Sequence, residues 1–231
     1  MPKGVLFDFE GTVARRADGK LENVLEQLRN LGYDIYRPEL RAAHDYVLHI
    51  DVPKHGHDHA EAFVEAVLKH LGLKPKRTEL MSLAPLFMEY YRFVLHEDAA
   101  RTIPAIARTH KVAIVSGLPS FLVHPVLEPV KGSIAAVVTP KESKACAPNP
   151  KTFRAAAQAL GLRPRDVAVV SADCDDGLAV PKALGFDTVH VRREGGAACP
   201  HAKTTIASLD ELERVLKPSA AVKVEAAAPS P

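Results

Sequence analysis

An apolar run near the amino terminus, residues 5–7, ends in two carboxylates, Asp8 and Glu10, which are followed by Gly11 and Thr12. Successive side chains of a β-strand point to opposite faces, so residues i and i+2 point the same way. We therefore expect Asp8 and Glu10 to face one site at the carboxyl end of a first strand. Ligands of open α/β sheets bind at that end of the strands. Gly11 allows the chain to turn away from the strand, and Thr12 adds a hydroxyl close by.

The second half of the chain alternates short apolar runs with helical patterns. Strands are predicted at residues 4–8, 112–115, 134–138, 167–170 and 188–191. Helices are predicted at residues 152–160, 178–184 and 208–216. This alternation indicates βαβ units and a parallel sheet. The expected fold class is therefore α/β with a Rossmann-like parallel sheet.

Roughly a hundred residues, on the order of a small domain, separate the first strand from the second. After a polar linker at residues 14–20, this stretch carries helical patterns at 21–31, 38–49, 58–71 and 78–96. We expect a Rossmann-like core formed by residues 1–14 and 96–217, interrupted by an all-helical cap at 15–95. Residues 218–231 are rich in Ala, Pro, Ser and Val and are predicted to be a disordered tail.

Charge and cysteine content limit the binding partners and the cellular compartment that we expect. With 30 basic and 28 acidic residues in 231, the net charge of +2 gives no case for a nucleic-acid or membrane partner. No apolar stretch is long enough to cross a bilayer, and no signal peptide precedes the first strand. Cys146, Cys174 and Cys199 are widely spaced and odd in number, so no disulfide framework is expected and a reducing compartment is favoured. We expect a cytoplasmic protein; the oligomeric state is left open.

Residues 5–13 resemble motif I of the haloacid dehalogenase-like (HAD) hydrolase superfamily, Asp-x-Asp-Gly-Thr after apolar residues. The resemblance implies that Asp8 is a nucleophile that forms an aspartyl intermediate, and that Glu10 is a general acid/base. The family usually has aspartate where this chain has Glu10, but enolase-phosphatases of methionine salvage carry a similar Asp-x-Glu-Gly-Thr. The helical insert resembles a family cap placed after motif I. The alternative is a buried strand with a capping aspartate and a turn glycine.

Ser116 follows the predicted strand at 112–115 and resembles motif II, whose hydroxyl hydrogen-bonds a phosphoryl oxygen. In a parallel sheet, Ser116 and Asp8 lie at the same edge. A serine–glycine pair after a strand is otherwise simply a turn.

Three carboxylates, Asp173, Asp175 and Asp176, follow the strand at 167–170. Crowded carboxylates repel one another, and Mg²⁺ binds one or two carboxylates together with waters and substrate phosphate. The stretch resembles motif IV, with Asp176 on its final aspartate and Asp173 in place of the aspartate that is missing at Ala172. The alternative is an acidic helix N-terminus, favoured by the helix dipole.

The resemblance implies Mg²⁺ held by Asp8, the backbone carbonyl of Glu10, Asp173 and Asp176. The same segment is also similar to 2-haloacid dehalogenases, which read Ser-x-Asn-x-x-Asp where this chain has Ser171, Asp173 and Asp176.

Motif III departs from the family pattern. The lysine of Lys-Pro-Asp-Pro falls on Ala147 in this chain. Lys144 or, further upstream, Lys141 could supply the missing ammonium from a loop, because lysine has a long flexible stem. The alternative is that both are solvated loop lysines.

Two further groups of polar side chains are a histidine cluster and a pair of arginines. His55, His57 and His59, with His44 and His49 nearby, fit no zinc spacing and are interpreted as a polar connector with Asp58 as helix N-cap; a role in substrate selection is left open. Arg15 and Arg16 follow motif I and are placed either at an anionic substrate or in a surface linker.

The function expected from this resemblance is a Mg²⁺-dependent phosphatase of a small phosphorylated metabolite, acting through an aspartyl-phosphate on Asp8. Glu10 would shuttle the proton, and Ser116, Thr12 and Lys144 would hold the phosphoryl oxygens. A 2-haloacid dehalogenase, in which Asp8 attacks carbon without a metal, is one alternative. A catalytically weak HAD-fold protein that binds a ligand or partner is another, and Ala147 and Ala172 favour it.

Overall fold

The computed structural model describes residues 1–17, 19–57, 59–193, 195 and 197–216, so the predicted tail at 218–231 lies outside the described residues. A parallel six-stranded sheet forms its centre, in the order β5-β4-β1-β6-β7-β8. The prediction of an α/β fold with a Rossmann-like parallel sheet is thereby confirmed. The strands are β1 (Gly4–Asp8), β4 (Lys111–Val115), β5 (Ala136–Val138), β6 (Val167–Ser171), β7 (Asp187–Val191) and β8 (Thr204–Ile206).

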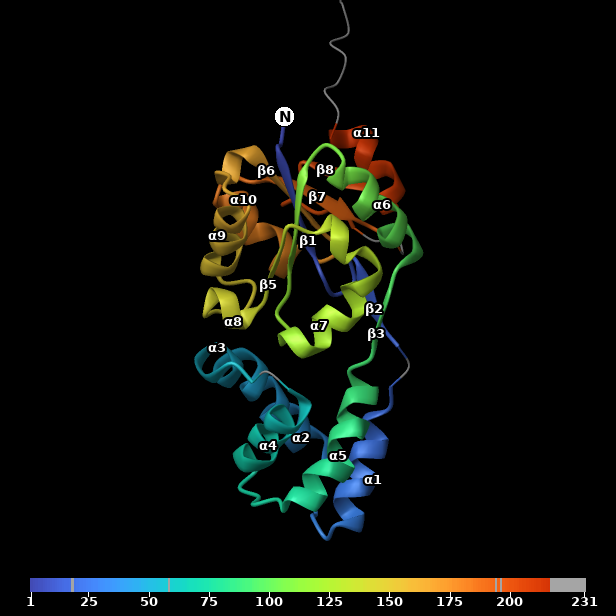
Figure 1. Cartoon of the computed structure of the whole chain (residues 1–231), viewed down its shortest axis with the longest axis vertical. Helices are drawn as coiled ribbons and strands as arrows, with labels where there is room; N and C mark the ends of the chain where they lie inside the picture. Colours follow the sequence, from blue (N-terminus) through green and yellow to red (C-terminus); the bar gives the residue numbers. More distant parts are fainter. Residues whose placement is uncertain (18, 58, 194, 196, 217–231) are drawn as a thin grey trace, which may run out of the picture.

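Alternate residues of the central strands bury opposite faces of the sheet, as the pleat requires. Val5 and Phe7 of β1 join the apolar cluster formed with α6 (Glu97–Ala107), α7 (Ser120–Leu127) and α11 (Leu212–Leu216). Leu6, between them, joins the cluster on the other face with α9 (Pro150–Ala159). Figure 1 shows these helices on the two sides of the sheet, with α8 (Pro140–Ser143) and α10 (Val180–Ala183) beside α9. Both faces are covered, so the central strands β1, β4 and β6 are mainly apolar.

The chain order of the strands reverses at β1. From β1 the chain builds β4 and β5 on one side, then crosses to build β6, β7 and β8 on the other. Such a reversal leaves a crevice at the carboxyl ends of the strands that flank it. The side chains that follow β1, β4 and β6 therefore meet at one edge.

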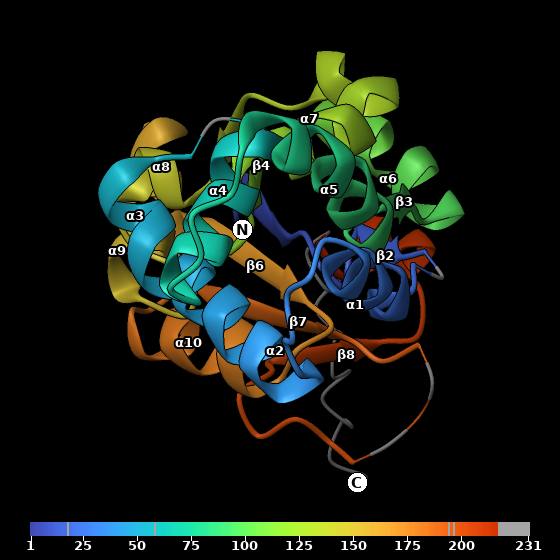
Figure 2. The same ribbon diagram turned by 90° about the horizontal axis from the view of Figure 1, so that it is seen from below.

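Five helices lie beyond this edge: α1 (Leu21–Asn30), α2 (Arg37–Tyr46), α3 (Val52–His55), α4 (Ala60–His70) and α5 (Arg77–Tyr90). A π-helical segment, Val47–Asp51, joins α2 to α3. Seen from below in Figure 2, these helices lie in front of the sheet. The predicted division at residues 15 and 95 stays a prediction.

The sequence did not indicate the short strands or the helices α6 and α7, and β3 (Phe93–Leu95) lies within the helix predicted at 78–96. β2 (Ala14–Arg16) pairs with β3 as an antiparallel ribbon, so residues 14–16 are not the expected linker. β8 was also not expected. Each of these strands has three residues, too few for an alternating pattern to be seen. The remaining short helical turns are η2 (Glu128–Ser133), η3 (Pro164–Asp166), η4 (Asp175–Ala179) and η5 (Leu209–Glu211). Within the described residues, no helix is long and apolar enough to span a membrane.

Candidate active site

Asp8 ends β1 at the carboxyl edge of the sheet, and two hydroxyl groups hold its carboxylate. Ser171 Oγ donates to Asp8 Oδ2 at 2.9 Å, and Thr12 Oγ1 donates to the same oxygen at 3.4 Å. Burial raises the pKa of Asp8 to about 7, although hydrogen bonds from Ser171 and the Phe9 N–H work in the opposite direction. The negative charges of Asp173 and Glu10 raise it further. The site therefore concentrates negative charge around a carboxylate that is poorly solvated.

Thr12 is fully buried beneath this carboxylate. Its hydroxyl oxygen accepts a hydrogen bond from the Ala172 N–H at 2.7 Å while the hydroxyl hydrogen faces Asp8. Thr12 thus ties the turn after β1 to the turn after β6. The structure thus shows contacts of Thr12 with Asp8 and Ala172, and its expected role in holding phosphoryl oxygens stays a prediction.

A cleft of about 340 Å³ opens above Asp8, between the edge of the sheet and the end of α2. It is large enough for a small molecule and at the lower end of the volumes typical of ligand pockets. Of the residues predicted from sequence, the structure brings five together along its wall: Asp8, Glu10, Ser116, Asp173 and Asp176.

Ser116 is buried at the end of β4, and its hydroxyl oxygen accepts the Leu118 N–H at 3.0 Å. The hydroxyl hydrogen is left to donate into the cleft. Cys146 also lines the cleft, where burial raises the pKa of its thiol to about 11. That thiol is neutral at physiological pH, so Asp8 remains the candidate nucleophile.

The acidic turn after β6 is organised by Asp173. Its Oδ1 accepts the N–H groups of Asp175 and Asp176, both at 2.9 Å, while the Asp173 N–H donates to Ser171 Oγ at 3.0 Å. Such contacts stabilise a helix N-terminus, which was the alternative interpretation of this acidic segment. The Asp176 carboxylate is exposed and lines the cleft, and a metal-binding role for it stays a prediction.

The donor chemistry of the cleft fits a hard cation such as Mg²⁺. Asp8, Asp173 and Asp176 supply carboxylate oxygens, and the negative charges of Asp173 and Glu10 raise the pKa of Asp8, so a nearby positive charge would relieve the crowding. Among the described residues, no group of three His, Cys, Asp or Glu side chains is close enough to hold a metal alone. Mg²⁺ sites commonly complete their six ligands with water and substrate phosphate, and this donor set is compatible with such a site.

The opposite wall of the cleft comes from β2, α2 and the π-helical segment. Arg16 contacts Glu10 at 3.6 Å and lies over the rings of Tyr90 and Tyr91, 5.1 and 5.3 Å from their centroids. His44 stacks on Tyr91 at 4.8 Å, and burial lowers its pKa to about 4. The wall thus presents a guanidinium held by aromatic rings beside an imidazole that is neutral at pH 7.

Lys144 does not lie among the described residues that line the cleft. It follows α8 in a left-handed conformation, with φ of 52°, and lines an adjoining hollow that shares His49, Cys146 and Ala147 with the cleft. Lys141 also lies outside the described cleft wall. Ala147 itself lines the cleft, at the position that the family's lysine would occupy. The cation in the described cleft wall is instead Arg16. The sequence had left open whether Arg16 contacts an anionic substrate or belongs to a surface linker.

The histidines of residues 55–59 have structural partners. His57 Nε2 contacts Asp51, and His55 Nε2 lies 3.7 Å from the same carboxylate. His59 caps α4 by accepting the Ala62 N–H at 3.3 Å, whereas Asp58, the expected cap, lies outside the described residues. Within the described residues these side chains form no cluster of three metal-binding groups.

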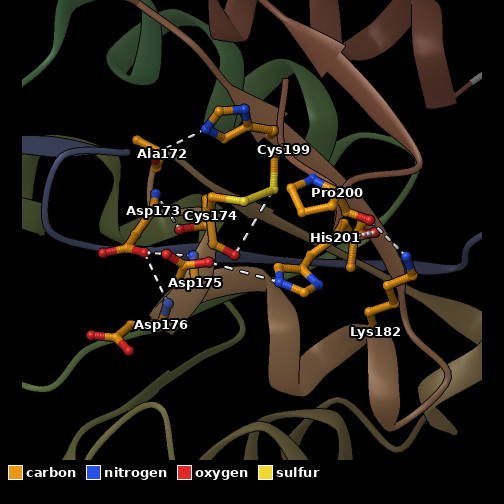
Figure 3. Close-up of a disulfide and its surroundings, with 12 residues drawn as sticks. Ala172, Asp173, Cys174, Asp175, Asp176, Lys182, Cys199, Pro200 and His201 are labelled. Carbon is orange, nitrogen blue, oxygen red and sulfur yellow. Dashed lines mark hydrogen bonds and ion pairs between the residues drawn. A yellow bond between two sulfur atoms is a disulfide. The ribbon is translucent and has the colours of Figure 1, made fainter. Parts of the chain in front are cut away.

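The expectation that no disulfide forms is wrong. Cys174, within the acidic turn, is bonded to Cys199, with Cα atoms 5.6 Å apart (Figure 3). An odd cysteine count misled the sequence argument, because two cysteines pair and Cys146 remains free. The inference of a reducing compartment loses its basis with it.

The disulfide attaches the acidic turn to the segment that follows β7. Two further contacts support this attachment in Figure 3. His201 Nε2 lies 3.7 Å from Asp175, and Lys182 Nζ donates to the Pro200 carbonyl at 2.7 Å. The turn that carries Asp173 and Asp176 is therefore attached to the segment at 199–201 through Cys174 and Asp175.

Solved structures similar to this chain include both phosphatases and dehalogenases. A HAD phosphatase from Thermococcus onnurineus is 21% identical with a TM-score of 0.65, and the match covers 93% of this chain and 97% of that one. A 2-haloacid dehalogenase from Pseudomonas syringae pv. tomato is 17% identical with a TM-score of 0.71, covering 94% and 98%. The L-2-haloacid dehalogenase from Xanthobacter autotrophicus is 18% identical with a TM-score of 0.62, covering 94% and 98%. At these identities the likeness concerns the fold.

No curated protein sequence matches this chain. The family model for haloacid dehalogenase-like hydrolases, in contrast, matches residues 2–185, from the start of β1 to the end of α10 and therefore through all the turns that form the cleft. The chain belongs to the haloacid dehalogenase-like hydrolase family and is a hydrolase.

Proposed function

We propose that this hydrolase cleaves small phosphomonoesters through an aspartyl-phosphate on Asp8. The observation that carries the proposal is the pair of acids after β1: Asp8 and Glu10 line the same cleft, on one side of the turn at Gly11. A phosphate ester needs a nucleophile and a proton donor for its leaving oxygen, and these two carboxyl groups can supply both. The cleft of about 340 Å³ suits a small substrate.

In the first step an oxygen of the Asp8 carboxylate attacks phosphorus as the bond to the ester oxygen breaks. Glu10, in its protonated form, gives its proton to the leaving alkoxide, and the alcohol departs. Ser171 and Thr12 hold Asp8 Oδ2, which fixes the plane of the attacking carboxylate. The Ser116 hydroxyl donates to a phosphoryl oxygen.

In the second step the Glu10 carboxylate takes a proton from water, and the resulting hydroxide attacks the phosphorus of the aspartyl-phosphate. The acyl-phosphate bond breaks, inorganic phosphate leaves, and the Asp8 carboxylate is regenerated. Arg16 Nη2 lies 3.6 Å from Glu10 Oε1, beside the acid that carries the proton through both steps.

Mg²⁺ would be held by Asp8, the backbone carbonyl of Glu10, Asp173 and Asp176, and when bound it would offset negative charge shared by the carboxylates and the phosphoryl group. The disulfide between Cys174 and Cys199 would keep Asp173 and Asp176 in place for it.

A second candidate function, 2-haloacid dehalogenation, is favoured by one contact. Ser171 donates to Asp8 where many phosphatases of the family have glycine followed by aspartate, so a hydroxyl lies beside the nucleophile. In that reaction Asp8 would attack the halogen-bearing carbon and release halide. Glu10 weighs against it, because a second carboxylate in the cleft repels a carboxylate substrate.

One panel assay separates these functions. Purified protein is incubated with small phosphate esters and with 2-chloropropionate, with EDTA or with Mg²⁺, and free phosphate and chloride are measured. We expect phosphate release that requires Mg²⁺, that is lost in Asp8→Asn by roughly 10⁴-fold, and that in Asp176→Ala requires more Mg²⁺. Circular dichroism confirms that each variant is folded. Chloride release without metal would instead select the dehalogenase, and no turnover of either class would favour a ligand-binding role.

A further inference from the structure

The two arginines after motif I lie on opposite sides of the ribbon. They occupy consecutive positions of β2, where successive side chains point apart. Arg16 lines the cleft that contains Asp8, whereas Arg15 lines a second hollow of about 370 Å³ on the other side of the Gly11 turn. The described residues of the two hollows do not overlap, so this second hollow is a separate feature.

The second hollow is strongly basic. Its described wall includes Arg15, His96, His190, Arg192 and Arg193, and no acidic side chain is found among these described lining residues. A nearby acid, Asp98, accepts hydrogen bonds from both terminal nitrogens of Arg193 at 2.5 and 3.1 Å.

That ion pair leaves part of Arg193 without a partner. Its Nη2 also donates to the Thr12 carbonyl at 2.8 Å, but Nε is buried and has no hydrogen-bond partner among the described residues. A buried donor that is left unsatisfied is costly, and a ligand with oxygen acceptors would supply the missing bond.

His190 adds a second unsatisfied atom to the same wall. The residue is 7% exposed, and its Nε2 donates to the Ala172 carbonyl at 3.2 Å, which fixes the ring. Its Nδ1 is buried and has no hydrogen-bond partner among the described residues. As an imidazolium, this side chain would donate from Nδ1 while keeping its bond to Ala172.

From this combination of a basic wall with two unsatisfied buried nitrogens, we propose that the second hollow is a binding site for a small oxyanion, such as inorganic phosphate or the phosphoryl group of a larger molecule. Arg15 and Arg193 supply charge, and His190 supplies a directional contact. His190 and Arg193 bind the backbone of Ala172 and Thr12, the residues that support Asp8, so an anion bound there would contact the back of the catalytic turns.

The pKa of His96 can report whether an anion is bound in the second hollow. Burial lowers its pKa, and the positive charges of Arg193 and Arg15 lower it further. An anion between these groups would offset their charges and favour the imidazolium, so the pKa of His96 would rise on binding. His96 lines the second hollow and not the described wall of the cleft, so its signal distinguishes the two.

The test is a titration of the full-length protein with inorganic phosphate, followed by NMR of the imidazole groups, with Arg15→Gln and Arg16→Gln as matched variants. We expect the His96 resonances to shift in the wild type and in Arg16→Gln. In Arg15→Gln the affinity for phosphate read at His96 should fall about tenfold or more, the loss typical of one charged hydrogen bond. Arg15 is exposed and its pairing in β2 is through the backbone, so Arg15→Gln is expected to fold.

His96 resonances that do not move at saturating phosphate would overturn the proposal. So would an equal affinity in the wild type and Arg15→Gln. Methylphosphonate serves as the second probe: binding tighter than that of phosphate assigns the site to the phosphoryl group of a larger molecule, and weaker binding assigns it to the free ion. The readout is binding and not turnover, so its result is independent of the proposed phosphatase activity.

Discussion

The Ser171 hydroxyl donates to Asp8 Oδ2 at 2.9 Å, although the two residues are 163 positions apart in the chain. The contact exists because β1 and β6 are parallel neighbours whose register runs from Gly4 opposite Val167 to Phe7 opposite Val170. Each side chain therefore leaves its strand at the same edge. The hydrogen bond stabilises the ionised carboxylate and partly offsets the burial that raises the pKa of Asp8 to about 7.

Ser171→Ala should move the acid limb of the activity profile to higher pH. Attack requires ionised Asp8, so kcat/KM falls as the pH drops through the pKa of this group. Loss of the hydrogen bond raises that pKa further, by roughly half a unit to one unit if the bond contributes about 1 kcal/mol. The measurement is kcat/KM against pH at fixed Mg²⁺, with Ser133→Ala as control. An unchanged acid limb would show that Ser171 does not tune Asp8.

Gly177→Ala tests how closely the acidic turn packs against Ser171. A Cβ at Gly177 would lie 2.0 Å from Ser171 Oγ, so the serine or the turn must shift. We expect a destabilisation of about 1–3 kcal/mol together with a loss of activity. Gly132→Ala is the matched control, because its Cβ would meet nothing within 4 Å. Denaturant unfolding and kinetics of both variants provide the measurement, and equal behaviour of the two would contradict the packing argument.

The parallel sheet was predictable because each of its central strands is visible as a local pattern in the sequence. Val5 to Phe7 and Val167 to Val170 are continuous apolar runs, as expected for strands covered on both faces. Once the sheet is parallel, the meeting of Asp8, Ser116 and Asp176 follows from the rule that strand ends share an edge.

Pairings between distant segments could not be read in the same way. The ribbon of β2 and β3 joins two three-residue strands, and its effect is to send Arg15 and Arg16 into different hollows. The bond between Cys174 and Cys199 depends on where the segment after β7 returns to the sheet. Neither has a signal within a window of local sequence, so each is a consequence of the tertiary fold.

Reduction of the disulfide should weaken the acidic turn. Cys199→Ser removes a crosslink that closes a sequence separation of 25 residues, and we expect a loss of about 2–4 kcal/mol in the free energy of unfolding. The Mg²⁺ concentration for half-maximal activity should rise, because Asp173 and Asp176 lose one of their attachments. Cys146→Ser, which leaves the disulfide intact, is the control. If both variants have the same free energy of unfolding and the same Mg²⁺ requirement, the crosslink does not hold the acidic turn in place.

The last prediction concerns the cation that accompanies the phosphoryl group. The position of the family's lysine is Ala147, and Lys144 lines a different hollow from Asp8. Arg16, in contrast, lines the cleft 3.6 Å from Glu10, and the rings of Tyr90 and Tyr91 restrict where its guanidinium lies.

Arg16→Gln should therefore lower kcat/KM by about 10- to 100-fold, the loss typical of one charge-assisted hydrogen bond, whereas Lys144→Ala should leave it within about twofold of the wild type. The same comparison at several salt concentrations checks that the difference is local, because a long-range effect of surface charge would diminish with ionic strength. A large loss in Lys144→Ala with a small one in Arg16→Gln would restore the lysine to the site and require the loop after α8 to move toward Asp8 during turnover.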